Sequence, residues 1–141
     1  MGGSLIPDRL TSRGYAGQMP SRLLVVSDDL FFAARVQAAG TRLGLQVEQV
    51  TPADIEGLAG AEDVVVLQVT LHSERQLALL QRLRSRKPAP VVVAVAGHLE
   101  TELRRKAKAL GASLASHSGL DRALARAAGI TLPPPLGEGS R

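Results

Sequence analysis

Short apolar runs alternate along this chain with segments of helical periodicity. Positions 22–26, 63–69 and 90–96 are nearly continuous runs of Val, Leu and Ala, typical of strands buried on both faces of a sheet. Positions 45–50 alternate between apolar and polar residues, which indicates an edge strand with one face in water. Positions 113–116 carry a shorter and weaker strand pattern. The sequence therefore predicts five strands.

Helical spacing of apolar residues fills the intervals between these runs. The pattern predicts helices over 29–43, 52–60, 73–87, 100–110 and 118–129. Local start signals support three of them: Thr51-Pro52 as N-cap and first residue, Ser73 with Gln76 as a capping box, and Ser118 with Asp121 at the last helix. Phe31 and Phe32 are expected to complete a core that is otherwise made of Leu, Val and Ala.

Strands that alternate with helices through short loops predict an α/β fold with a doubly wound parallel sheet. Right-handed crossovers leave few topologies, and the order 2-1-3-4-5 places the polar strand at an edge and the apolar strands in the centre. This is a flavodoxin-like arrangement. We expect one domain over 21–130, an N-terminal tail over 1–20 and a Pro/Gly-rich C-terminal tail over 131–141.

Composition narrows the function classes. The absence of Cys excludes disulfides and thiolate metal sites and fits a reducing compartment. No apolar run approaches the roughly 20 residues that span a bilayer, and the start lacks a signal-peptide core. We therefore expect a cytoplasmic protein with no membrane partner. The net charge of +4 is too small to indicate nucleic-acid binding by itself.

Four motifs in order resemble those of the response-regulator receiver domain: LLVVSDD at 23–29, DVVVLQ at 63–68, PVVVAVA at 90–96 and ALGA at 109–112. The chain is also similar to short, stand-alone receivers, in which DLFF after the first motif and Gly97-His98 recur. The resemblance implies the receiver fold over about 21–128. For the family as a whole it implies phosphoryl transfer to an aspartate at the end of strand 3, with Mg²⁺ held by an acidic pair after strand 1.

This sequence departs from the family's phosphorylation site. Aligned by strand ends, the acidic pair falls on Ser27 and Asp28 and the acceptor aspartate on Gln68. The Ser/Thr that reads the phosphate falls on Val95, and the Lys falls on Ser118, with a shift of one residue left open. An amide cannot form an acyl phosphate and valine has no hydroxyl. We therefore expect a degenerate receiver with no catalytic residues, no metal and no cofactor, in which Asp28 and Asp29 stabilise the start of a helix.

Three histidines, His72, His98 and His117, follow the third, fourth and fifth strands. The carboxyl ends of parallel strands share one edge of a sheet, where ligands bind in such folds. Together with Asp28 the histidines are candidates for a replacement metal or anion site. No pair has the i, i+4 spacing of a strong metal motif, so solvated or capping roles are the favoured interpretation.

Basic residues gather on the last two predicted helices. Arg104, Arg105 and Lys108 share an outward arc of one helix, and Arg122 and Arg126 lie i and i+4 on the next. In receivers this region is the usual partner face. The alternative is a solvated face, since Glu100–Arg104 and Glu102–Lys106 have the favourable order for ion pairs.

The sequence favours a non-catalytic pseudo-receiver, not an enzyme, that binds a protein partner in signalling without phosphorylation. One alternative is a basic nucleic-acid-associated protein, although no aromatic stacking platform is evident. Another is a sensor of a small ligand or metal at the carboxyl edge of the sheet. The identity of the partner stays open, and so does homodimer formation.

Overall fold

The computed structural model describes residues 22–130 and shows five parallel strands in the order β2-β1-β3-β4-β5. The fold class and the strand order predicted from the sequence are confirmed. Expectations for the two tails concern segments outside the described residues. In chain order the elements are β1 (Leu23–Val26), α2 (Leu30–Arg42), β2 (Val47–Gln49), α3 (Pro52–Leu58), β3 (Val64–Gln68), α4 (Ser73–Arg84), β4 (Val91–Val95), α5 (Thr101–Ala109), β5 (Ser113–Ala115) and α6 (Leu120–Ala127).

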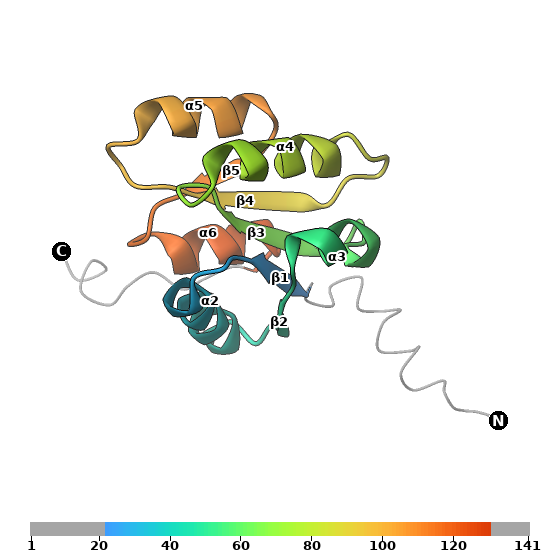
Figure 1. Ribbon diagram of the computed structural model, residues 1–141. Helices are drawn as coiled ribbons and strands as arrows, with labels where there is room; N and C mark the ends of the chain where they lie inside the picture. Colours follow the sequence, from blue (N-terminus) through green and yellow to red (C-terminus); the bar gives the residue numbers. More distant parts are fainter. Residues whose placement is uncertain (1–21, 131–141) are drawn as a thin grey trace.

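Helices cover both faces of the sheet (Figure 1). Helices α3, α4 and α5 pack on one face, where Ile55, Leu80 and Ala107 belong to a single buried cluster. Helices α2 and α6 pack on the other face, where Phe32 and Leu124 belong to a second cluster. Since side chains alternate along a strand, each central strand contributes to both clusters, which explains its continuous apolar run. Within residues 22–130, no helix has the length and apolar character that crossing a membrane requires.

Phe31 was expected in the core, and this expectation is wrong. Its side chain is 85% exposed, whereas Phe32 is buried at 2%. Neighbouring residues on a helix point about 100° apart. Helix α2 meets the sheet with the stripe that contains Phe32 and Val36, so Phe31 faces outward.

Two of the three predicted helix starts differ from expectation. Thr51 caps α3 as predicted, and its side chain accepts the N–H of Asp54. Helix α4 begins after His72, whose backbone is left-handed, and the Ser73 hydroxyl donates to the carbonyl of Val69. The predicted capping box is therefore absent, because the tight turn after β3 places Ser73 inside the helix.

The N-cap of the last helix also lies one residue later than the predicted Ser118. Gly119 is the N-cap of α6, and its N–H donates to the Ser116 hydroxyl at 3.2 Å. The carboxylate of Asp121 binds Arg42 of α2 in a two-point contact, with both N–O distances 2.8 Å. That ion pair joins α2 and α6 and lowers the pKa of Asp121 through hydrogen bonding and charge attraction.

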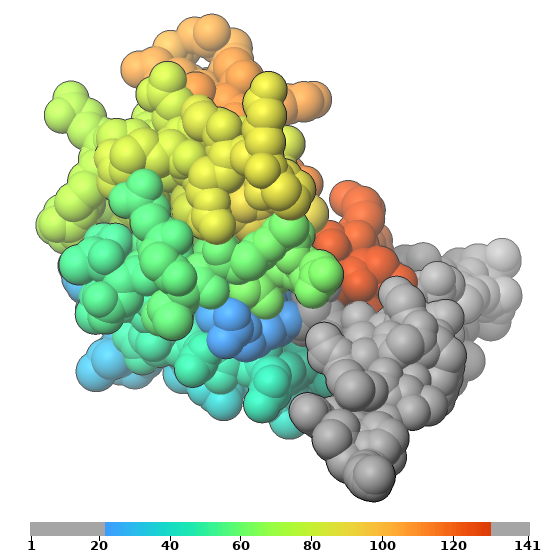
Figure 2. Space-filling view, turned by 90° about the vertical axis from the view of Figure 1, so that its right-hand side faces the viewer, coloured from blue at the N-terminus to red at the C-terminus, as the bar shows by residue number. Residues whose placement is uncertain are grey.

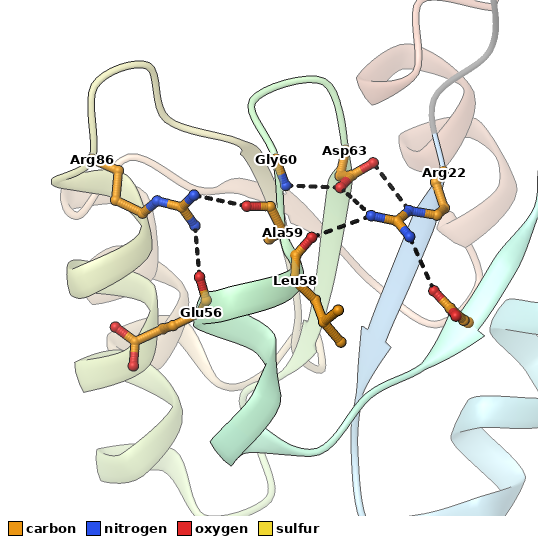
Figure 3. A network of polar contacts seen from close by, with 8 residues as sticks. Arg22, Glu56, Leu58, Ala59, Gly60, Asp63 and Arg86 are labelled. Atoms are coloured by element: carbon orange, nitrogen blue, oxygen red, sulfur yellow. Dashed lines mark hydrogen bonds and ion pairs between the residues drawn. The ribbon is translucent and has the colours of Figure 1, made fainter.

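A polar network closes the amino-terminal edge of the sheet (Figure 3). The guanidinium of Arg22 donates to both carboxylate oxygens of the buried Asp63 and to the carbonyl of Leu58. The guanidinium of Arg86, two residues after the end of α4, donates to the carbonyls of Glu56 and Ala59. Both cations thus satisfy carbonyl groups at the C-terminal end of α3, where the helix dipole is negative.

This network fastens α3 to the start of β1, so that both stay beside β3. Figure 2 looks onto this edge and shows the start of β1 (blue) directly beside the segment from α3 to β3 (green). Structural contacts therefore occupy the amino-terminal edge. The opposite edge, where the strands end, carries the residues singled out in the sequence.

Candidate functional site at the carboxyl edge of the sheet

Strands β1 and β3 are neighbours, and their carboxyl ends bring Ser27 and Gln68 together. The Ser27 hydroxyl donates to Gln68 Oε1 at 2.6 Å, and both residues are buried. The Gln68 side-chain amide donates in turn to Asp29 Oδ2 at 3.2 Å. The backbone N–H of Asp29 donates back to the Ser27 oxygen at 2.9 Å. These three residues form a closed ring of hydrogen bonds, which we call the Ser27–Gln68–Asp29 ring.

The Asp29 carboxylate has a second structural role in this ring. As the N-cap of α2 it accepts the backbone N–H groups of Phe31 and Phe32. The hydrogen bond from Gln68, with those two backbone bonds, holds the pKa of Asp29 below its ordinary value. The carboxylate is ionised at neutral pH, and hydrogen bonds within the domain already occupy both its oxygens.

Asp28, the only acidic residue that survives in the aligned pair, turns away from the ring. Its carboxylate lies 3.3 Å from Arg75 Nη2 and 3.7 Å from His72 Nε2, both on or beside α4. These contacts are at the surface, where all three side chains are about half exposed. The helix-start role expected for both aspartates thus holds for Asp29, while Asp28 bridges to α4.

The remaining positions of the aligned site are Val95, which has no hydroxyl, and Ser118, which has no ammonium group. Val95 is fully buried and pairs in register with Gln68 on one side and Ala115 on the other. Strand β5 ends at Ala115, so Ser116 follows it directly and Ser118 lies two residues further. The two hydroxyl oxygens are 3.3 Å apart. The assignment of Ser118 to the lysine position stays a prediction, and Ser116 is nearer to the end of the strand.

The three histidines share the carboxyl edge but do not converge. His72 lies against Asp28, while the ring of His117 packs edge-on against Phe32 with centroids 6.2 Å apart. Among residues 22–130, no group of three or more His, Cys, Asp or Glu side chains is placed to hold a metal ion. The structure therefore lends no support to the replacement metal site.

Comparison with solved structures identifies the architecture. A response regulator from Thermotoga maritima superposes with a TM-score of 0.68 at 17% identity, over 79% of this chain and 99% of its own. The chain has the receiver fold. A receiver protein from Burkholderia phymatum gives 0.65 at 17% identity over 81% and 99%, and the receiver domain of NtrX from Brucella abortus gives 0.63 at 23% over 77% and 99%. No family model and no curated protein matches the sequence.

In this receiver fold, β5 is the edge strand between α5 and α6, which carry the basic residues (Figure 1). Arg105 and Lys108 are exposed on α5, as expected. Arg104 was expected on the same outward arc, and this is wrong. Its guanidinium donates to the carbonyl of Ala96 at 2.9 Å and lies 3.5 Å from that of Ala115. The long side chain reaches back to the carboxyl ends of β4 and β5 instead of extending into solvent.

The ion pairs on α5 also differ from the predicted i, i+4 spacing. Glu102 pairs with Arg105, one turn along the helix, and this contact lowers the pKa of Glu102. The Glu100 carboxylate accepts the backbone N–H of Gly97 at 3.3 Å, in the loop that leads into the helix. The acidic side chains of α5 are thus engaged locally.

A groove follows the open side of β5. Arg104, Arg122 and Arg126 line its larger part, a hollow of about 530 Å³ floored by Leu114 and Ala123. A smaller hollow of about 320 Å³ shares Leu114, Ala123 and Arg126 and is bordered by Lys108. We call the two together the β5 groove. Four of the five basic residues predicted to form the interaction surface line it, while Arg105 lies outside.

Sequence reasoning missed two features of the carboxyl edge. The mutual hydrogen bonds of the ring were not foreseen, although a hydroxyl and an amide at the ends of neighbouring strands are a recognisable signal. Leu30, Phe31 and Leu99, in the first turn of α2 and before α5, are strongly exposed apolar side chains. Periodicity alone did not distinguish Phe31 from Phe32. The two residues are adjacent, and the spacing of apolar residues does not fix the border of the buried helix face to better than one position.

Proposed function

We propose that this receiver-fold domain is a non-catalytic signalling module that binds a protein partner through α5, β5 and α6 without being phosphorylated. The observation that carries the proposal is the Ser27–Gln68–Asp29 ring. An amide takes the place of the acceptor carboxylate, and its two polar atoms are already bonded to Ser27 and Asp29. A nucleophile for phosphoryl transfer has to be an ionised carboxylate in this setting, and an amide has no such reactivity.

The ring also supports the proposal that the conformation of the domain does not depend on a phosphate. A ligand shifts a protein between states only by its differential interaction with them. The ring joins the ends of β1 and β3 to the start of α2 through internal bonds that require no phosphate. The buried Val95 offers no hydroxyl to be drawn toward one. The basic residues of α5 and α6 are therefore available to a partner without phosphorylation.

Acetyl phosphate with Mg²⁺ is expected to leave the protein unmodified. The reason is that Gln68 cannot accept the phosphoryl group and Asp29 has both carboxylate oxygens hydrogen bonded. Intact-mass spectrometry after incubation checks this, with a phosphorylatable receiver treated in parallel as the positive control. An added phosphoryl group at any aspartate of the domain would refute the proposal.

Reversing the charge at Arg105 and Arg126 is expected to weaken partner binding and leave folding stability nearly unchanged. Both side chains are exposed, and exposed charges contribute little to stability. The loss of affinity should be larger at 0.01 M salt than at 0.1 M, since the screening length falls from about 30 Å to about 10 Å. The measurement is a titration at both salt concentrations against the partner recovered by pull-down.

The matched control for this experiment reverses Arg82 and Lys87, which are exposed and lie in or just after α4, outside α5, β5 and α6. Arg82, like Arg105, forms one surface ion pair. It changes the net charge by the same amount. If both double variants bind alike at low salt, the basic face is only solvated and the proposed interaction surface is wrong.

A further inference from the structure

The β5 groove has a shape and chemistry that specify its partner more closely, and this inference rests on the proposed function. We propose that the groove takes an extended, acidic peptide segment that pairs with the open edge of β5 as a sixth strand. The features that carry it are the unpaired backbone edge, a floor made mostly of alanine residues and the cationic walls.

The backbone of β5 leaves one residue open for pairing. The carbonyl of Ala115 accepts the N–H of Ala96, so the polar backbone groups of Ala115 face β4. Successive residues of a paired strand turn these groups toward opposite edges. The N–H and carbonyl of Leu114 therefore point away from the sheet into the groove, where Leu114 is a lining residue. An added strand can accept a hydrogen bond from this N–H and donate one to this carbonyl.

The floor of the groove suits a peptide backbone. Apart from the partly exposed Leu114, its apolar lining consists of the small residues Ala112, Ala115, Ala123 and Ala127, so a chain can approach β5 closely. Helices α5 and α6 precede and follow β5 in the chain, and residues of both line the groove beside the strand. Peptides that add to a sheet edge gain affinity from main-chain hydrogen bonds and specificity from the side chains on either side.

The walls select for acidic side chains. Arg104, Lys108, Arg122 and Arg126 supply four positive charges along the groove. The one carboxylate that lines it, Asp121, is bound to Arg42 on the side of α2. Glutamate or aspartate side chains at alternating positions of the added strand would reach these cations from both sides of the backbone.

A peptide fits these observations better than a nucleic acid does. Non-specific single-strand binding sites combine cations with aromatic side chains on which bases stack. The lining residues of the groove include no aromatic side chain. The open N–H and carbonyl of Leu114 match the donor and acceptor pattern of a polypeptide.

The sharpest test compares Leu114→Pro with Leu114→Ala. Both remove the leucine side chain, and only proline removes the N–H, which points to the open edge where proline is tolerated in sheets. The probe is a labelled octapeptide of alternating glutamate and valine, titrated by fluorescence anisotropy at low salt. We expect Leu114→Pro to bind about fivefold more weakly than Leu114→Ala, the loss that corresponds to one hydrogen bond.

A second measurement keeps the test decisive if Leu114→Pro does not fold. In the unmodified protein, hydrogen exchange at the Leu114 amide should slow on addition of the peptide, because its N–H becomes bonded. Unchanged exchange at Leu114 in the presence of bound peptide would overturn strand addition. Equal binding by Leu114→Pro and Leu114→Ala, both folded, would also overturn it.

Further measurements distinguish this inference from the proposed function and from other possible ligands of the groove. A lysine–valine octapeptide should not bind, and a single-stranded oligonucleotide that binds as tightly as the acidic peptide would overturn the choice of a peptide. Self-association that Leu114→Pro abolishes and Leu114→Ala retains would identify the added strand as one from a second copy, which overturns a separate acidic partner. If the pulled-down partner responds to reversal of Arg105 and Arg126 but not to Leu114→Pro, the inference fails while the proposed function stands.

Discussion

Replacing Gln68 by glutamate is expected to destabilise the domain by about 1–3 kcal/mol at pH 7. Glutamate has the shape of glutamine, so its Oε1 can still accept the hydroxyl of Ser27. The amide nitrogen, which now donates to Asp29 Oδ2 at 3.2 Å, becomes an anionic oxygen that faces another anionic oxygen. A part-buried hydrogen bond is thus exchanged for a repulsion between two carboxylates.

The destabilisation should shrink as the pH is lowered toward about 4. In the variant, repulsion raises one carboxyl pKa of the pair above its unfolded value of about 4. Between these two values the folded state binds more protons than the unfolded state, so its stability falls as pH rises. In the unmodified protein the pKa of Asp29 is lowered, so its contribution is present above about pH 4 and is lost only as pH falls through the depressed pKa. Urea unfolding at pH 4, 5, 6 and 7 measures the difference.

The reciprocal double variant, Gln68→Glu with Asp29→Asn, is the matched control. The amide introduced at position 29 can donate to the carboxylate introduced at position 68, which restores one hydrogen bond with donor and acceptor exchanged. Asparagine is also as good an N-cap as aspartate, so the start of α2 is preserved. We expect the double variant to recover most of the loss. Equal stability of Gln68→Glu and the unmodified protein at pH 7 would contradict the geometry of the ring.

Replacing Gly40 by alanine is expected to destabilise the domain by about 1–3 kcal/mol, the usual range for overpacking. Gly40 lies in the interior of α2, where alanine would ordinarily be favoured by about 1 kcal/mol. A methyl group at this position would overlap Val47 Cγ2 of β2 and lie 3.1 Å from Leu23 Cδ1 of β1. Glycine therefore permits the close approach of α2 to the edge of the sheet, and the tertiary contact reverses the sign expected from helix propensity.

Gly57 provides the opposite case in the same protein. It lies in α3, and a methyl group there would meet no atom within 4 Å. Gly57→Ala should therefore stabilise the domain by about 0.5–1 kcal/mol. Urea unfolding of both variants checks the contrast, and adding Val47→Ala to Gly40→Ala should relieve part of the loss. A stabilising Gly40→Ala would show that α2 and β2 are not in close contact.

The sequence by itself determined the architecture, because the information is local and repeated. The side chains of the continuous apolar runs at β3 and β4 point to both faces of the sheet, so both faces have to be buried. Apolar and polar residues alternate around β2, which places that strand at an edge with one face in solvent. Alternating strands and helices with short connections then leave few topologies. The sequence likewise predicted that Gln68, an amide, ends the strand where the resemblance places the acceptor carboxylate, and Gln68 is the last residue of β3.

Only the tertiary structure decided how the side chains at the strand ends are used. Whether Ser27, Gln68 and Asp29 bond to one another depends on the spacing of β1, β3 and α2, which lie far apart in the sequence. Arg104 fitted an outward arc by helical angle, yet its long side chain turned to the carbonyls at the ends of β4 and β5. Phe31 and Phe32 differ by one position, and the orientation of α2 against the sheet determined which is buried. Periodicity specifies which face of an element is apolar, whereas the partners of polar groups are set by distances between elements that periodicity does not contain.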